Sequence, residues 1–173
     1  MSDLSNRSIV TIRAKSHTYS VIIGQGLIKE LLEVDQPLIV ADRRFREMLE
    51  SQGRFGCIYI DAVESSKTLS TVEEVIISLQ KLGARSNSKV VAIGGGIIQD
   101  IMTLVASLYM RGIAWIYVPT TLLAMADSCV GGKSSINTKT VKNLIGNIFP
   151  PETIYADTDF ISTLSDEDFS AGL

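Results

Sequence analysis

The sequence is poor in the residues that build metal centres and disulfide frameworks. It contains two cysteines and one histidine in 173 residues. A zinc site takes four ligands, which this set does not reach without carboxylates. Two cysteines also cannot staple a small secreted domain. We therefore expect a chain from a reducing, cytoplasmic setting, in which Cys and His alone do not form a zinc site.

Positive charge and long apolar runs are also scarce. The 16 Lys and Arg residues are outnumbered by 19 Asp and Glu, for a formal charge of −3, which disfavours a nucleic-acid partner. Asp100, Arg111 and Asp127 interrupt the longest apolar stretches, and none of these stretches approaches the roughly 20 residues that cross a bilayer. We expect neither nucleic acid nor a membrane as a partner.

The apolar residues that are present follow strand and helix patterns in alternation. They make up 46% of the chain, against 20% charged residues, which excludes intrinsic disorder, and the length fits one domain. Alternation over 8–14 and 17–23 predicts an opening β-hairpin, and helical periodicity appears over 70–83 and 98–109. Buried strands are predicted at 37–41, 57–60, 89–93, 115–118 and 153–157. This order indicates an α/β fold, a parallel sheet with helices on both faces.

Capping residues predict the start of a helix after the strand 37–41 and both ends of the helix 70–83. Asp42, directly after a buried strand, is expected to cap the next helix. Ser70 and Glu73 fit a capping box at the start of the clearest helix. Gly83 fits its C-terminal stop.

Three glycines, Gly94, Gly95 and Gly96, join a predicted strand to a helix. Glycine lets the backbone come close to a pyrophosphate, and a helix N-terminus offers unpaired N–H groups and a positive dipole. The run is not the G-x-G-x-x-G fingerprint, and a tight turn without a ligand is an equally good interpretation. Asp100, in the first helical turn on this pattern, is often only a partner of the helix dipole.

The run VPTTLLAMADSCVGGKSSIN, residues 118–137, carries two hydroxyls, an acid, a glycine pair and a lysine. Lys133 after two glycines suits a phosphate, but the P-loop spacing fails because Asp127 stands where the first glycine belongs. Taken alone, each residue has a simpler interpretation. Thr120 and Thr121 can cap the next helix, and Asp127 can be a surface acid.

The polar stretch 126–150 is long for a crossover, and long ordered loops in compact domains are usually functional. Lys142 and Asn143 suit a polar ligand, although a solvated loop is the simpler interpretation of that pair. Cys129 is a candidate reactive thiol, with no partner identifiable from sequence.

Four further residues are interpreted as structural. Glu64 and Lys67 have the spacing of a surface ion pair, which contributes little stability. His17 fits a half-exposed strand position, and Cys57 fits a small core residue.

Taken in order, the motifs resemble the 3-dehydroquinate synthase family and the wider group of sugar phosphate cyclases. The ordered run is GGG-x-x-x-D, YMRGI, VPTTLLA-x-x-DS, GGK, IN and KN-x-I-G, and it covers residues 94–147 densely. The resemblance implies that residues 1–173 form one Rossmann-like, NAD-binding α/β domain with an N-terminal β-hairpin. Residues 164–173 would lead into a C-terminal helical domain that is absent from this chain.

The resemblance also implies roles for individual residues. Implied contacts to NAD come from Asp42, Glu64, Lys67, Gly95, Gly96, Asp100, Thr120, Thr121, Lys133, Lys142, Phe160, Thr163 and Leu164. Implied substrate and catalytic residues are Asp127, Lys133, Asn143 and Arg111, the last reaching the substrate phosphate of a neighbouring subunit in a homodimer.

The activity that the resemblance implies is conversion of a heptulosonate phosphate to a carbocycle. NAD⁺ transiently oxidises a ring alcohol, phosphate leaves by elimination, the ketone is reduced again, and an intramolecular aldol step closes the ring. The family also uses a divalent metal, zinc or cobalt. Its ligands, a glutamate and two histidines, would all lie beyond Leu173, so this chain alone is expected to be inactive.

Two other functions stay open at this point. Metal-dependent polyol dehydrogenases share the GGG-x-x-x-D turn and the threonine pair, but a neutral polyol gives Lys133 and Lys142 nothing to bind. A non-catalytic nucleotide-binding domain fits a chain without metal ligands. Gln99 stands where dehydroquinate synthases more often carry a small residue or threonine, so the substrate itself is left open.

Overall fold

The computed structural model describes residues 7–13, 17–34, 37–53, 56–170 and 172. The strands are β1 Ser8–Arg13, β2 Thr18–Gly24, β3 Leu38–Asp42, β4 Gly56–Ile60, β5 Lys89–Gly94, β6 Ala114–Pro119 and β7 Thr153–Asp157. The α-helices are α1 Leu27–Val34, α2 Arg46–Gln52, α3 Leu69–Lys81, α4 Gly96–Leu108 and α5 Asp166–Ser170. Short helical segments are η2 Arg43–Phe45, η3 Glu64–Ser66, η4 Tyr109–Arg111, η5 Ala124–Ser128 and η6 Thr158–Thr163.

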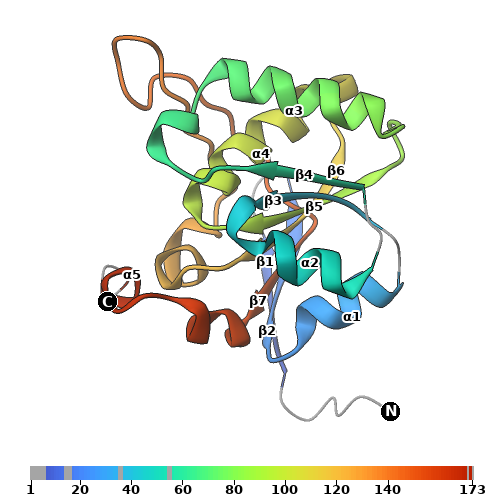
Figure 1. Ribbon diagram of the computed structural model, residues 1–173, viewed down its shortest axis with the longest axis vertical. Coiled ribbons are helices and arrows are strands. Elements are labelled where there is room, and N and C mark those ends of the chain that lie inside the picture. Colours follow the sequence, from blue (N-terminus) through green and yellow to red (C-terminus); the bar gives the residue numbers. More distant parts are fainter. Residues whose placement is uncertain (1–6, 14–16, 35–36, 54–55, 171, 173) are drawn as a thin grey trace.

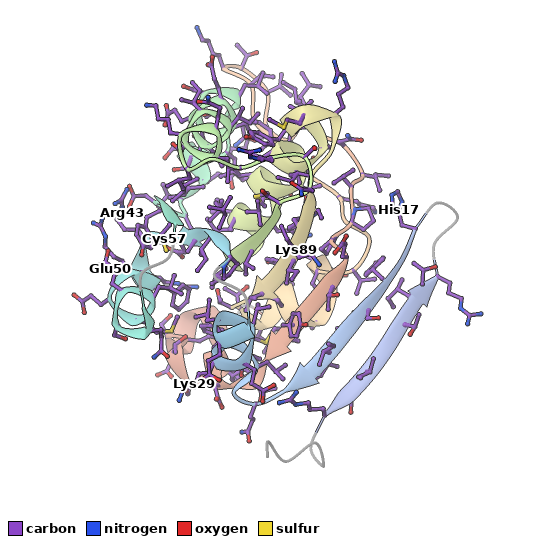
Figure 2. The ribbon with its side chains drawn as sticks, turned by 90° about the vertical axis from the view of Figure 1, so that its right-hand side faces the viewer. His17, Lys29, Arg43, Glu50, Cys57 and Lys89 are labelled. Carbon is purple, nitrogen blue, oxygen red and sulfur yellow. The ribbon has the colours of Figure 1, made fainter. Side chains whose placement is uncertain are left out.

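The strands form one sheet in the order β1-β2-β7-β6-β5-β3-β4. Strands β2 to β7 pair in parallel, and β1 pairs antiparallel with β2, which confirms the predicted hairpin and α/β class. Helices α3 and α4 lie on one side of the sheet, and α1 and α2 lie on the other (Figure 1). The β1–β2 hairpin extends along one edge, away from the helices (Figure 2).

The alternation of side chains along β5 divides the core into two clusters. Val90 and Ala92 belong to the cluster beneath α3 and α4, whereas Val91 and Ile93 belong to the cluster beneath α1 and α2. Successive side chains of a strand point to opposite faces, so a strand covered on both faces is apolar throughout. This is why short continuous apolar runs located these strands correctly.

The helix caps are only partly as predicted. α3 begins one residue earlier than expected, and its cap is Thr68, whose Oγ1 accepts a hydrogen bond from the Thr71 N–H at 3.2 Å. The predicted capping box at Ser70 is therefore wrong, since Ser70 lies inside the helix and donates to Glu74. Gly83 follows the helix with φ of +80°, a conformation that glycine adopts without strain, and confirms the predicted stop.

The chain reverses its direction across the sheet between β3 and β5. From β3 it proceeds outward to β4, and then it returns to place β5 on the opposite side of β3. In open α/β sheets, ligands bind outside the carboxyl ends of the strands at such a switch point. The carboxyl ends of β3 and β5 carry Asp42 and the three glycines.

The long loop after η5 folds back on itself as a small irregular hairpin. Lys133 pairs with Ile148, and Ile136 pairs with Ile145, in isolated antiparallel bridges. Gly132 has φ of +58°, and a Cβ at that position would overlap Pro150. The loop is thus closely packed at its base. None of the helices in the described ranges is long and apolar enough to cross a bilayer.

Candidate functional site

The glycine turn at the end of β5 leaves open space beside the backbone at one position, the half-buried Gly96. A Cβ on Gly94 would overlap Ile98, so glycine is required there by internal packing. A Cβ on Gly96 would meet nothing closer than Ser128 Oγ at 4.0 Å. Gly96 is the first residue of α4, where the helix N–H groups have no intrahelical partners. The space beside Gly96 therefore gives a ligand access to a helix N-terminus.

The threonine pair lies against the same turn. The N–H of Thr120 donates to the carbonyl of Gly94 at 3.1 Å, and Thr120 is fully buried. A Cβ on Gly95 would lie 3.0 Å from the Thr121 methyl group. Thr121 Oγ1 also accepts from the Ala124 N–H at 3.3 Å, so the simpler interpretation of Thr121 as a capping residue holds as well.

Arg44 joins the ends of β3 and β6 across this crevice. Its Nε lies 3.0 Å from one carboxylate oxygen of Asp42, and its backbone N–H donates to the other at 3.1 Å. Its Nη2 donates to Thr120 Oγ1 at 3.2 Å. Asp42 caps η2 as predicted. Sequence analysis missed Arg44, since nothing in a local pattern shows that this side chain reaches Thr120.

A buried ion pair lies beside the glycine turn. Lys67 is only 6% exposed, and its ammonium lies 2.8 Å from Asp100 Oδ2. The ammonium also donates to Asn143 Oδ1 at 3.1 Å and lies 3.8 Å from Glu64. The interpretation of Lys67 as a surface residue is therefore wrong. Burial raises the pKa of the Asp100 carboxyl, and pairing with Lys67 opposes that effect.

Two details of this cluster correct the sequence analysis. Asp100 is the fifth residue of α4, and so it lies beyond the first turn. Asn137 is a further member that sequence analysis did not single out. Its Nδ2 donates to Glu64 Oε1 and its Oδ1 accepts from the Asn143 N–H, both at 2.8 Å.

Asn137 thereby joins the loop to η3, and Asn143 has a left-handed backbone with φ of 55°. A hollow of about 490 Å³ opens beside this contact. Its lining residues are Glu64, Ser65, Thr68, Asn137, Thr138, Lys139, Thr140, Val141 and Lys142. The loop after η5 and the segment at the start of α3 line this hollow together, and the two segments adjoin in Figure 1.

Several predicted site residues are exposed. Asp127, Lys133 and Lys142 are all exposed on the long loop or on η5. Arg111 is exposed in η4, which follows the C-terminal end of α4. Because α4 starts at the carboxyl end of β5 and runs back along the sheet, Arg111 lies at the opposite end of α4 from the glycine turn.

The predicted NAD contacts that follow β7 are Phe160 and Thr163, which lie in η6, and Leu164, which is the C-cap of η6. Phe160 is 3% exposed, and its ring packs edge-on against Phe45 with centroids 5.2 Å apart. Thr163 Oγ1 donates to the carbonyl of Phe160 at 2.7 Å. Leu164 is half-buried and donates its N–H to Ile161. In this structure Phe160 is a core residue whose ring is covered.

Cys129 does not have the environment of a reactive thiol. It is 1% exposed, and burial raises its pKa to about 11. Its Sγ donates to the Met125 carbonyl at 3.3 Å. Since the thiolate is the nucleophile, a thiol held protonated is inert at neutral pH, and the hypothesis of a reactive thiol is wrong.

The described residues do not suit a divalent metal. No group of three or more His, Cys, Asp or Glu side chains lies close enough together in the described ranges to hold one. Where Glu64 and Asp100 approach one another, the ammonium of Lys67 lies between them. A cation already satisfies these carboxylates, so we assign no metal-dependent step to this chain's residues.

A dinucleotide suits the same region better. The open backbone at Gly96, the α4 N-terminus and the switch point are the usual elements of a pyrophosphate site. Asp42 is placed at the end of the strand adjacent to the glycine turn. An acid at that position typically binds a ribose hydroxyl.

Comparison with known sequences identifies the family of the chain. Residues 57–171 match the family model for the 3-dehydroquinate synthase N-terminal domain. The chain is 43% identical to 3-dehydroquinate synthase from Clostridium tetani over 73% of its length and 34% of that protein. It is 33% identical to the Pelagibacter ubique enzyme over 93% of its length and 48% of that protein.

Two solved structures of sugar phosphate cyclases are similar to the chain. The chain is similar to 2-epi-5-epi-valiolone synthase from Streptomyces hygroscopicus subsp. jinggangensis 5008, solved with NAD⁺ and Zn²⁺ (TM-score 0.83, 31% identity, 93% of this chain and 49% of that one). It is similar to 2-deoxy-scyllo-inosose synthase in complex with carbaglucose-6-phosphate, NAD⁺ and Co²⁺ (TM-score 0.82, 26% identity, 95% and 49%).

An iron-containing alcohol dehydrogenase from Corynebacterium glutamicum shares only the fold, at 16% identity and a TM-score of 0.69 over 88% of this chain and 43% of that one. The chain spans about half the length of the curated relatives that it matches over most of its own length. With a family model that covers most of the chain and relatives at 33–35% identity, the chain belongs to the 3-dehydroquinate synthase family.

Proposed function

We propose that this chain is the NAD-binding half of a 3-dehydroquinate-synthase-like cyclase, which converts a heptulosonate phosphate to a carbocycle with loss of phosphate. The observation that carries the proposal is the open backbone at Gly96, on the N-terminus of α4 and at the switch point of the sheet. The similarity to cyclases solved with NAD⁺ supports it.

NAD is the cofactor that we propose for this crevice, and it would supply the hydride chemistry. The backbone at Gly95 and Gly96 would hold the pyrophosphate, and Asp42 would accept a hydrogen bond from a ribose hydroxyl. The Asp42 carboxylate is engaged by Arg44, but each carboxylate oxygen has two lone pairs, so acceptor capacity remains. We propose that Asp100 and Lys67 keep the adjoining loop in place.

The long loop would bind the anionic substrate. Lys133 is exposed after two glycines, and its ammonium can reach outward to a phosphate or carboxylate. Asp127 is exposed on η5 and Lys142 on the long loop, and Asn143 is held by Asn137 and Lys67. Their roles as substrate contacts remain part of the proposal.

The other half of the protein would complete the site. The relatives are about twice as long as this chain. We propose that a helical domain beyond α5 supplies the metal ligands, and that 1–173 is a single folding unit that binds NAD without turnover.

We propose a homodimer in a reducing, cytoplasmic setting. The side chains of the edge strand β1 are largely exposed, including Ile9 at 68% and Val10 at 46%, which suits an intermolecular contact. Arg111, far from the glycine turn along α4, is free to serve a neighbouring subunit's substrate phosphate. The two cysteines are free thiols, as a reducing compartment keeps them.

A polyol dehydrogenase is the less favoured alternative. The likeness to the alcohol dehydrogenase extends to the fold alone, at 16% identity, whereas the valiolone synthase reaches 31%. The exposed Lys133 and Lys142 also have no role toward a neutral polyol. A non-catalytic nucleotide-binding domain would show NAD binding but no activity after the missing half is restored.

The test is calorimetry of the chain with NAD⁺, comparing wild type with Gly96→Ala. Alanine meets no protein atom closer than 4.0 Å at this position, so the fold should persist while the pyrophosphate is pushed away. Gly95→Val should also abolish binding, but its side chain would press on Thr121, which makes Gly96→Ala the cleaner variant.

Ser107→Ala, at the other end of α4, serves as the control and should bind like wild type. A wild-type chain without a saturable NAD⁺ signal contradicts the proposal. Turnover of a heptulosonate phosphate by the chain alone contradicts its assignment as an incomplete enzyme.

A further inference from the structure

We propose that Arg44 is a cofactor-binding residue whose guanidinium contacts the pyrophosphate of the dinucleotide. This inference rests on the proposed function, because it assigns a contact within the same crevice. Neither local sequence pattern nor the motifs described above single out Arg44.

The position of Arg44 is the first argument. Its Nη2 donates to Thr120 Oγ1 at 3.2 Å, and the Thr120 N–H donates to the Gly94 carbonyl at 3.1 Å. Thr120 therefore links the guanidinium to Gly94, the first residue of the glycine turn, through these two hydrogen bonds. Arg44 starts from the end of β3 and reaches to the end of β6, so it spans β5, which lies between these strands.

The guanidinium is held in one orientation and still has donors to offer. Asp42 pairs with Nε at 3.0 Å, Thr120 accepts from Nη2, and the carbon atom of the guanidinium lies 4.8 Å from the Phe45 ring centroid. An arginine has five N–H donors. The contacts to Asp42 and Thr120 use two of them, and three remain for a ligand.

The charge of the crevice is the second argument. A pyrophosphate brings two negative charges, and a helix N-terminus offers only about half a positive charge. The ammonium of Lys67 is already engaged by Asp100, Asn143 and Glu64. Arg44 side-chain exposure is 37%, so its guanidinium is both accessible and anchored. A planar fork of this kind suits bidentate binding of phosphate oxygens.

A purely structural role is the competing explanation. Arg44 would then serve only to tie η2 to the sheet through Asp42. Asp42 is only 8% exposed, so loss of the Arg44 charge should lower the melting temperature under either explanation, and a melt alone does not separate them. Cofactor affinity, by contrast, should fall if the guanidinium contacts phosphate oxygens.

The experiment measures the Kd of the chain for NAD⁺ and for NADP⁺ by calorimetry, at low and at physiological salt. Arg44→Gln keeps a polar but shorter side chain with amide donors and removes the charge, and Arg44→Lys keeps the charge but removes the fork. The matched control is Arg43→Gln. Arg43 pairs with Asp61 at 2.6 Å and lies at the outer edge of the sheet in Figure 2.

We expect Arg44→Gln to weaken NAD⁺ and NADP⁺ by the same factor, about tenfold or more for a lost charge-assisted hydrogen bond. Its affinity should also depend less on salt than that of wild type. Arg44→Lys should be intermediate, and Arg43→Gln should match wild type. If Arg44→Gln melts early, the comparison of Arg44→Lys with wild type decides instead.

Unchanged NAD⁺ affinity in the Arg44 variants overturns the inference and leaves the proposed function intact. A loss confined to NADP⁺ also overturns it, because the guanidinium would then contact the 2′-phosphate. Absence of NAD⁺ binding by wild type is the distinct outcome that removes the proposed function itself.

Discussion

The ammonium of Lys67 lies 2.8 Å from the carboxylate of Asp100, in an ion pair that joins the segment before α3 to α4. The same ammonium donates to Asn143 at 3.1 Å, so one cation holds together a side chain of α4 and the long loop after η5. Burial of Lys67 makes the pair sensitive to the loss of either partner.

Lys67→Met is expected to destabilise the chain by on the order of 3 kcal/mol at neutral pH, because it leaves a partly buried carboxylate without its cation. Lys89→Met is the matched control. Lys89 forms an equally short pair with Glu152, but both side chains are about half exposed. Such a pair contributes below about 1 kcal/mol. Equal losses in urea denaturation of the two variants would contradict the prediction.

The pH dependence of stability should reveal Asp100. Burial raises the pKa of its carboxyl above 3.8, and this effect exceeds that of Lys67. Between 3.8 and the raised pKa, the folded state therefore binds more protons than the unfolded state. The contribution of Asp100 to the unfolding free energy accordingly falls as pH rises through this window.

Denaturation of wild type and Asp100→Asn at a series of pH values tests this sign. The unfolding free energy of wild type, relative to the variant, should decrease with rising pH. A relative stability that increases with pH would show that pairing with Lys67 outweighs burial.

The hydroxyls of Thr68 and Ser70 should differ in their contribution to stability, because only Thr68 caps α3. Thr68→Ala should cost about 1 kcal/mol, since it removes the acceptor for the Thr71 N–H. Ser70→Ala should change stability by less than about 0.5 kcal/mol, because Ser70 lies on the exposed side of the helix. Thermal melts of both variants check this, and a larger effect at Ser70 would restore the capping box.

The two cysteines should differ in reactivity. Cys129 is buried and has a pKa of about 11, whereas Cys57 is half-buried on β4. A thiol reagent at pH 8 should modify Cys57 first and leave Cys129 intact until the chain unfolds. Mass spectrometry after peptide digestion identifies the site. Early labelling of Cys129 would show that η5 opens readily.

Lys133→Met is expected to lower kcat/KM for a sugar phosphate about tenfold to a hundredfold once the missing half is restored by fusion or co-expression. The loss corresponds to one charge-assisted hydrogen bond. Lys133 is exposed, so the melting temperature should not change. Lys29→Met, exposed on α1, is the control. Unchanged activity with a normal melt would remove Lys133 from the substrate site.

Local pattern was sufficient for most of the fold. The runs 89–93 and 153–157 became β5 and β7, because a strand covered on both faces must be apolar throughout. Gly83 indicated the end of α3 from sequence alone, since the left-handed conformation that often follows a helix favours glycine. The order of the motifs along the chain also sufficed to identify the family.

Local pattern did not decide between hydroxyls that both suit a cap, and α3 is capped by Thr68 instead of Ser70. It also could not show that Lys67 is buried, that Cys129 is inert or that Arg44 reaches Thr120. Each of these depends on which segments distant in sequence become neighbours in space. The sheet order places the ends of β3, β5 and β6 side by side, and only that arrangement determines the charge and burial of the crevice between them.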